Sequence, residues 1–479
     1  MPEKSSLVKD LELILGRDRV ISHPTELLVY DCDGLMLSKY GADAVVLPKS
    51  TEEVAKIVKC CVQHEIPFLA RGSGTGLSGG AVAAEGGVII QMSKMDSILE
   101  VNYDNEIAVI QPGVINLHLS DATSSNGYHY APDPSSQKAC TIGGNVAENA
   151  GGPHTLKYGV TANHVLGLTM VMPNGEITKL GGQSEDCTGY DLVGLFVGSE
   201  GTLGIATEIT VKLIRNPEAV KTFLASYQSV QDASNSVSNL ISAGIIPAAL
   251  ELIDNLVIQS GESHLKGGFP LDVAAVLLIE IDGLSSTLAD QTQKIHKICY
   301  KSGATNFQEA KSEEERQRLW RGRKEAIGAI GKMTPAFYTN DGVVPRSKLP
   351  EILQFDVEVG KRHGLRIGHL CHAGDGNIHP TIFYDPDDEN QVKAAADTSR
   401  EILQKCIDLG GALSGEHGIG TEKLNAFKFM FSDDDEAQML SVRSAFNPSG
   451  LLNPSKIFPT GATCGESKIR KTVAGGGWL

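Results

Sequence analysis

No two of the nine cysteines stand in a Cys-x-x-Cys arrangement, and the nine are scattered along the chain. We therefore expect neither an iron–sulfur cluster nor a disulfide framework. The chain also lacks an apolar run of about 18 residues, and Met1–Asp10 lacks the segments of a signal peptide, so we expect no membrane span and no cleaved leader. A net charge of −16 without a long basic run argues against nucleic acid and anionic membranes as partners.

Two features of the chain are informative: its length and its clusters of glycine. At 479 residues it exceeds the size of one simple core, which predicts two or three domains. Its 52 glycines gather in clusters, which indicates backbone that approaches a ligand closely. The composition is that of an ordinary globular protein. We expect a cytoplasmic location, and peripheral association with a membrane through a partner is left open.

Regular strands and helices are predicted on both sides of Pro217. Ala44–Leu47 and Pro67–Ala70 are predicted strands, and Ser50 is predicted to cap the helix between them. The second strand of this β-α-β unit leads directly into the loop Arg71–Gly80. Beyond Pro217 the predicted order becomes β-α-β-β-α, which indicates an antiparallel sheet with helices on one face. The predicted fold class is therefore α+β.

The loop Arg71–Gly80, RGSGTGLSGG, contains a formal Gly-x-Gly-x-x-Gly at Gly74, Gly76 and Gly79. A Rossmann unit needs a helix directly after that motif, whereas Ala81–Gly87 leads into an apolar strand. The better interpretation is a loop whose backbone N–H groups surround a pyrophosphate, with glycine because a Cβ would block the approach. The alternative is a flexible linker, which fits poorly with an apolar strand on each side.

Two further glycine-rich segments would extend this site. The first combines Pro132–Ser136 with Thr141–Asn145 and Asn149–Gly152, and the second is Gly198–Ile205. Both offer amides, hydroxyls and bare backbone. Three such loops in one region indicate one long ligand that carries phosphates and a flat polar ring, and FAD has these features.

The segment Cys371–Pro380, CHAGDGNIHP, places His372 and His379 on either side of a turn-rich run. Apolar strands are predicted before and after it, so a hairpin can bring the two imidazoles together. Converging imidazoles bind a divalent metal such as zinc, and Glu416 in Ser414–Gly418 could complete the site. The alternative is that both histidines end their strands and bond backbone carbonyls.

Taken in order, these motifs resemble those of the FAD enzymes of the vanillyl-alcohol-oxidase type. RGSGTGLSGG is followed by PDPSS, TIGGNVAENAGG and GSEGTLGI, and then by HAGDGNIH and SGEHGIG. More narrowly, the series is similar to that of the D-2-hydroxy-acid dehydrogenase branch, whose members act on glycolate, D-lactate or D-2-hydroxyglutarate. The resemblance covers roughly residues 20–460. It implies a two-part FAD-binding domain and an α+β substrate or cap domain with an antiparallel sheet.

The resemblance also implies how the chain is divided and where FAD lies. Residues 1–217 would form the FAD-binding domain, 218–425 the substrate domain with a metal site, and 426–479 a segment that packs back toward the FAD domain. The implied cofactor-binding residues are Arg71, Gly72, Ser73, Gly74, Thr75, Gly76, Leu77, Ser78 and Gly79 for the pyrophosphate, Pro132, Asp133, Ser135, Ser136, Thr141, Gly144, Asn145 and Gly151 for the isoalloxazine and ribityl groups, and Glu200, Gly201 and Ile205 for the adenine side. Thr75 stands where that loop's histidine would fall in members with covalent flavin, so we expect non-covalent FAD.

At the reacting end, the resemblance implies a zinc or manganese ion bound by His372, His379 and Glu416. His417 would then be the general base that takes the substrate's hydroxyl proton; the alternative is a solvated loop histidine. Arg323 lies in the family's Trp-x-x-Arg pattern, and it would bind the substrate carboxylate.

The predicted reaction is the oxidation of a small D-2-hydroxy acid, glycolate or D-lactate, to the 2-oxo acid, with a hydride passed to flavin N5. Thr381 stands where the 2-hydroxyglutarate enzymes carry an asparagine, which favours a small acid. The electrons would go to a quinone, a cytochrome or an iron–sulfur partner subunit rather than to NAD, and a homodimer is left open. The alternatives are a D-2-hydroxyglutarate dehydrogenase, a sugar or aldonolactone oxidase on the same fold, and a non-catalytic flavoprotein that relays electrons.

Overall fold

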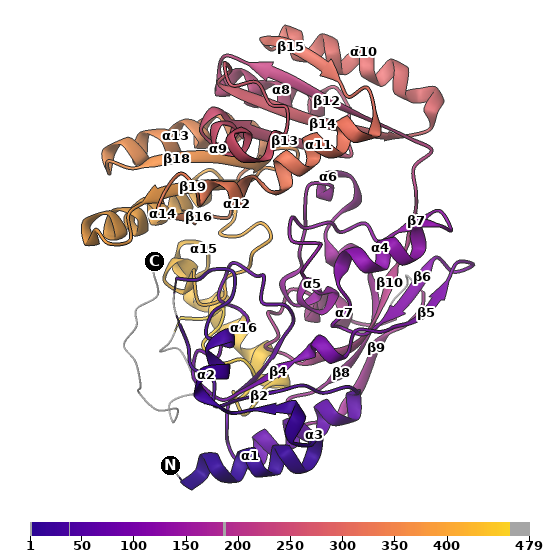
Figure 1. The fold of residues 1–479 in the computed structure, drawn as a ribbon, viewed down its shortest axis with the longest axis vertical. Helices are drawn as coiled ribbons and strands as arrows, with labels where there is room; N and C mark the ends of the chain where they lie inside the picture. Colours follow the sequence, from indigo (N-terminus) through magenta and orange to yellow (C-terminus); the bar gives the residue numbers. More distant parts are fainter. Residues whose placement is uncertain (1, 38, 185–187, 460–479) are drawn as a thin grey trace. The chain divides into compact units, whose positions relative to one another are not determined.

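The chain forms two compact units in the computed structural model, which describes residues 2–37, 39–184 and 188–459 (Figure 1). Among the described residues, the first unit comprises 2–37, 39–150, 160–184, 188–216 and 416–459, and the second comprises 151–159 and 217–415. The domain boundaries inferred from the sequence, at 217 and 425, stay a prediction, and residues 460–479 of its last segment lie outside the described residues. Within the described ranges, no helix has both the length and the apolar character needed to cross a membrane.

A four-stranded sheet in the first unit leads to the first glycine-rich loop. Its strands, in spatial order, are β1 (Val20–Ile21), β2 (Ala44–Val46), β4 (Val88–Gln91) and β3 (Phe68–Arg71). Strands β2, β4 and β3 are parallel, and α3 (Thr51–Gln63) makes the crossover from β2. The helix starts where the sequence predicts, because Ser50 Oγ accepts a hydrogen bond from Glu53 N at 3.3 Å. Helix α1 (Pro2–Leu15) packs its buried face of Leu7, Leu11 and Leu15 into the same core.

The first unit also contains a five-stranded antiparallel sheet. Its strands, in spatial order, are β5 (Ile98–Asn102), β6 (Ile107–Ile110), β10 (Ile205–Lys212), β8 (Val165–Val171) and β9 (Ile177–Gly181). Strand β10 alternates buried and half-buried residues and begins directly after the third glycine-rich loop. Helices α4 (Asn116–Ser124) and α5 (Ile142–Glu148) lie between β6 and β8 in the sequence. The second glycine-rich segment is therefore partly helical.

The second unit is built on one large antiparallel sheet. Its strands, in spatial order, are β15 (Ala304–Glu309), β12 (Ala219–Tyr227), β14 (Ala275–Gly283), β13 (Ala249–Asp254), β18 (Arg366–His372), β19 (Asn377–Tyr384) and β16 (Ala336–Thr339), with β17 (Gly342–Val343) also paired to β19. The antiparallel sheet predicted for this part of the chain is confirmed.

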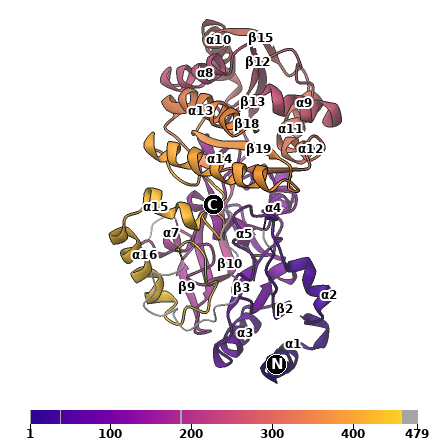
Figure 2. The ribbon, with the colours of Figure 1, turned by 90° about the vertical axis from the view of Figure 1, so that its left-hand side faces the viewer.

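Helices cover both faces of this sheet, so the prediction of helices on one face is wrong. One layer contains α8 (Val230–Ser242), α10 (Ser285–Lys301), α13 (Leu349–Arg362) and α14 (Glu389–Asp408), and the other contains α9 (Asn255–Leu265), α11 (Glu313–Lys324) and α12 (Ala326–Ile330) (Figure 2). The physical reason lies in the central strands. Every residue of β13 and of β19 is buried, rather than every second one, and a strand that is buried on both sides needs a cover on both faces of the sheet.

Candidate active site

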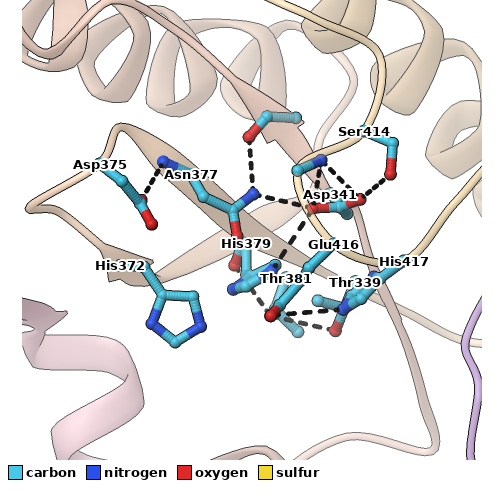
Figure 3. Close-up of polar contacts among 12 residues, drawn as sticks. Thr339, Asp341, His372, Asp375, Asn377, His379, Thr381, Ser414, Glu416 and His417 are labelled. Carbon is cyan, nitrogen blue, oxygen red and sulfur yellow. Dashed lines mark hydrogen bonds and ion pairs between the residues drawn. The ribbon is translucent and has the colours of Figure 1, made fainter. Parts of the chain in front are cut away.

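His372 and His379 lie within the two strands of a hairpin rather than in the turn between them (Figure 3). Leu370 pairs with His379, and His372 pairs with Asn377. Because side chains two residues apart on a strand share a face, both histidines point to the same side of the sheet. Their ring centroids are 5.2 Å apart, and both side chains are buried. The hairpin therefore brings the two imidazoles together.

The third candidate ligand lies on the loop that follows Ala412. Glu416 and His417 directly follow Gly415 in this loop. One ligand atom from each of His372, His379 and Glu416 lies within 4.8 Å of the other two. Two imidazoles and one carboxylate form a donor set that suits Zn²⁺ and leaves further positions open to a substrate. His417 Nε2 lies 3.9 Å from Glu416 Oε1, and the His417 side chain is 14% exposed.

Glu251 was not identified from the sequence, yet it is bonded to one of the two histidines. Strand β13 pairs Leu252 with Cys371, and one further step of this register places Glu251 opposite His372. His372 Nδ1 lies 2.9 and 3.0 Å from the two carboxylate oxygens of Glu251. Burial raises the pKa of the Glu251 carboxyl, but Arg323 and His372 outweigh burial, so this pKa lies below its usual value. An ionised Glu251 requires the proton on Nδ1, which leaves His372 Nε2 for a metal.

Arg323 is fully buried on α11 and forms an ion pair with Glu251. The other residue of the Trp-x-x-Arg motif, Trp320, also contacts a carboxylate of the sheet, because its Nε1 donates to Glu280 Oε2 at 2.6 Å. Arg323 Nε has no hydrogen-bond acceptor among the described residues, so the guanidinium retains a donor. Its contact with a substrate carboxylate stays a prediction.

The three glycine-rich loops meet within the first unit. Gly72 of the first loop lies so close to Thr141 that a Cβ would overlap the hydroxyl oxygen. The second and third loops are joined by two backbone hydrogen bonds, from Gly198 N to Val146 O and from Glu200 N to Ala147 O, both at 2.8 Å. The loops that the sequence analysis assigned to one ligand therefore lie side by side.

Two charged residues of these loops already bond other parts of the first unit. Arg71 is buried and donates to Ala81 O at 2.9 Å and to Cys32 O at 2.8 Å, and burial lowers its pKa. Glu200 accepts hydrogen bonds from Ile419 N and Gly420 N, both at 2.7 Å. Both residues hold the shape of the loops. Their contacts with FAD stay predictions.

The other predicted cofactor-binding residues lie in or beside the same loops. Gly74 has φ +68°, and a Cβ there would overlap the Arg71 guanidinium, so this position requires glycine. Thr141 Oγ1 caps α5 by accepting a hydrogen bond from Gly144 N at 3.3 Å. The first unit also contains Ser73, Thr75, Gly76, Leu77, Ser78, Gly79, Pro132, Asp133, Ser135, Ser136, Asn145, Gly201 and Ile205, whereas Gly151 belongs to the second unit.

Two protein-family models match the chain. The FAD binding domain matches residues 42–181, and the C-terminal domain of FAD linked oxidases matches residues 216–457. Glycolate oxidase subunit GlcD of Escherichia coli (strain K12) is 44% identical over 441 residues, which cover 92% of this chain and 88% of that protein. The chain belongs to the FAD-linked oxidases of the vanillyl-alcohol-oxidase type. It is an FAD-linked oxidoreductase, as the order of its motifs predicts.

Further comparisons agree with this assignment. Glycolate oxidase subunit GlcD of Bacillus subtilis (strain 168) is 41% identical, with 90% of this chain and 92% of that protein covered. D-lactate dehydrogenase of Anaerostipes hadrus is 36% identical, with 88% and 90% covered. The crystal structure of p-cresol methylhydroxylase with substrate bound has the same fold, with a TM-score of 0.81 over 95% of this chain and 97% of that chain at 17% identity. The predicted fold class and FAD as the cofactor of this FAD-linked oxidase are confirmed.

Proposed function

We propose that this FAD-linked oxidase oxidises a small D-2-hydroxy acid, glycolate or D-lactate, to the corresponding 2-oxo acid. The observation that carries the proposal is the convergence of His372, His379 and Glu416, in a chain whose relatives at 41–44% identity are named glycolate oxidase subunits. When bound, FAD supplies a hydride acceptor at N5, and a divalent metal supplies a Lewis acid for the substrate hydroxyl.

The donors at the candidate site fit zinc or manganese. His372 presents Nε2 because Glu251 holds Nδ1, and this carboxylate–histidine arrangement is common behind metal-bound imidazoles. Glu251 is fully buried, and its negative charge is balanced by the positive charge of Arg323. This ion pair does not balance the charge of Glu416. A divalent cation would offset the charge of Glu416 and would favour the neutral form of both imidazoles. These contacts support a metal centre and are unnecessary for two strand-end histidines that bond backbone carbonyls.

Two side chains are assigned roles toward the substrate. His417 accepts the proton of the substrate hydroxyl, and its partial exposure lets that proton reach solvent afterwards. Arg323 Nε donates to the substrate carboxylate while Nη2 stays on Glu251. The ion pair with Glu251 holds Arg323 in one position, so little side-chain entropy is lost when the substrate binds.

A small substrate is favoured by Thr381. This residue lies two positions after His379 on β19 and so shares its face of the sheet. Its hydroxyl lies 3.3 Å from the Thr339 hydroxyl and donates to His379 O at 3.4 Å. A buried hydroxyl that bonds its own sheet offers less to a second substrate carboxylate than an amide would. This supports glycolate or D-lactate over D-2-hydroxyglutarate.

The electrons leave through an acceptor other than NAD. The glycolate oxidase relatives are named as subunits, which supports a partner protein that takes electrons from the reduced flavin of this chain. The chain's scattered cysteines give no motif for an iron–sulfur cluster of its own. A quinone or cytochrome is the alternative acceptor.

An anaerobic titration of the purified protein tests this function. We expect glycolate or D-lactate to bleach the visible absorption of the bound flavin, and we expect L-lactate and D-2-hydroxyglutarate to do so poorly. Aldonolactones serve as the control for a sugar oxidase. A flavin that stays oxidised with all small 2-hydroxy acids would refute the proposal and favour a subunit that only relays electrons.

A further inference from the structure

Four neighbouring strand segments of the second unit carry a row of acid, imidazole, imidazole and acid. Glu251 on β13 faces His372 on β18, and His379 on β19 shares that face of the hairpin. The register between Thr339 and Thr381 on one side, and between Gly342 and Ile378 on the other, places Asp341 opposite His379. The two outer carboxylates, Glu251 and Asp341, are each 0% exposed. Each candidate metal-binding imidazole therefore has a buried carboxylate on its outer side.

Asp341 lies at a break in the sheet. Strands β16 and β17 pair with β19 in one continuous register, but the ladder is interrupted at Pro380, which has no N–H to donate. Asn340 N still donates to Pro380 O at 3.0 Å, so the backbone does not leave the sheet. The interruption leaves Asp341 between the two strands, beside the loop that carries Ser414 and Gly415 (Figure 3).

The Asp341 carboxylate connects the hairpin to that loop. It accepts hydrogen bonds from Ser414 Oγ at 2.5 Å and from Gly415 N, which lies 3.0 Å from both oxygens. From the hairpin it accepts a hydrogen bond from Asn377 Nδ2 at 2.8 Å. His379 Nε2 lies 3.7 Å away. A Cβ on Gly415 would overlap Asn377 Nδ2, so the loop is pressed against the hairpin at this residue.

Asp341 could instead be a metal ligand, because one ligand atom from each of Asp341, His379 and His417 also lies within 4.8 Å of the other two. The hydrogen bonds argue against that role. A carboxylate has about four lone-pair sites, and Ser414, Gly415 and Asn377 use both oxygens of Asp341. Coordination of a metal would compete with the donors that hold the loop. All three donors are neutral groups, and two of them, Ser414 and Gly415, hold the loop on the hairpin.

We propose that Asp341 is a positioning residue of the metal centre: it fixes the Ser414–Gly415 turn on the hairpin and so sets Glu416, the next residue, for metal binding. Because the peptide bond joins Gly415 to Glu416, freezing the Gly415 amide restricts where the Glu416 carboxylate can lie. The candidate ligands His372 and His379 are held by the β18–β19 hairpin. Through Ser414 and Gly415, Asp341 restricts the position of the third candidate ligand, Glu416. The inference rests on the proposed function, since it presupposes the metal.

The test compares metal affinity in the full-length protein with FAD bound. Zn²⁺ and Mn²⁺ are added to metal-stripped protein in competition with a chromogenic chelator, which gives a dissociation constant without any turnover. Asp341→Asn keeps the shape of the side chain and one oxygen for Asn377 Nδ2, but it replaces the other oxygen with an NH2 group, which cannot accept from Ser414 Oγ or Gly415 N. We expect metal binding to weaken about 10- to 100-fold, as for other residues that support metal ligands. Flavin content should stay unchanged.

Two further variants keep the test decisive. Asp356→Asn is the matched control, because Asp356 is also a fully buried carboxylate of the second unit but bonds His369 instead of the loop. It should leave metal affinity within about twofold of wild type, whatever it does to stability. Ser414→Ala removes one of the loop's hydrogen bonds and should weaken metal binding about 2- to 10-fold even if Asp341→Asn folds poorly.

The outcomes separate this proposal from the proposed function. Wild type that binds metal tightly, together with equally tight Asp341→Asn and Ser414→Ala, would overturn the role of Asp341 and leave the proposed function standing. Wild type that binds neither ion would overturn both the metal centre and the role of Asp341. Weakened binding in Asp341→Asn and Ser414→Ala, but not in Asp356→Asn, would support the role.

Discussion

His369 is held between two buried carboxylates on the face of the sheet opposite the candidate metal site. Its Nδ1 lies 3.0 Å from Asp254 Oδ2, and its Nε2 lies 3.3 Å from Asp356 Oδ2 on α13. Burial lowers the pKa of His369, but the hydrogen bonds and charges of Asp254 and Asp356 outweigh it and raise this pKa from 6.5 to about 9. The protonated imidazole therefore stabilises the folded second unit.

The size and direction of this effect follow from linkage. Because the pKa of His369 is higher in the folded state, its stabilisation is complete below pH 6.5 and is lost as the pH rises through about 9. Each pKa unit corresponds to about 1.4 kcal/mol, so the free energy of unfolding should fall by about 3 kcal/mol across this range. His369→Gln cannot titrate and should lack this fall.

The measurement is urea unfolding from about pH 6 to 10, followed by tryptophan fluorescence, because Trp320 is buried in the second unit. The quantity to compare is the difference between wild type and His369→Gln, since other groups that titrate in this range contribute equally to both. Asp356→Asn should move the pH dependence to lower pH, because one of the two carboxylates that raise the pKa of His369 is then neutral. A difference between wild type and His369→Gln that is the same at every pH would refute the reasoning.

Three further predictions concern the candidate active site. His372→Ala should abolish stoichiometric Zn²⁺ or Mn²⁺ and turnover while flavin absorbance stays; metal analysis of the purified variant decides this, and unchanged turnover contradicts the metal role. Glu251→Gln should weaken metal binding about 10- to 100-fold and lower the urea midpoint, because Arg323 is then buried without a counter-ion; tight metal binding in the folded variant would argue against Glu251 as the group that orients His372. Thr381→Asn should raise kcat/KM for D-2-hydroxyglutarate relative to D-lactate, and an unchanged ratio would remove Thr381 as a determinant of substrate size.

The local motifs could be recognised from the sequence because their chemistry lies in consecutive residues. A loop that must approach a phosphate needs glycine at particular steps, as at Gly74 with its positive φ. The turn between His372 and His379 is short, so the hairpin follows from composition and spacing alone. The order of these motifs then resembled one family, which the comparisons confirmed.

The supporting residues could not be found in this way. Glu251 and His372 are 121 residues apart, and Asp341 and Ser414 are 73 apart. Nothing beside Glu251 or Asp341 in the sequence distinguishes either from a surface carboxylate. The sequence also did not predict that α9, α11 and α12 cover the second face of the large sheet, because the order of helices along the chain does not determine on which face each one packs.

The sequence by itself determined the family and the FAD cofactor, and it marked the candidate residues for FAD and for a metal, since these depend on residue type and local spacing. Only the tertiary structure decided that Glu251 lies next to His372 and Asp341 next to His379, because these contacts depend on strand order and register. A shift of one residue in the pairing of β13 with β18 would turn Glu251 to the opposite face from His372. The pairing of distant strands, rather than any motif, places Glu251 and Asp341 beside the site.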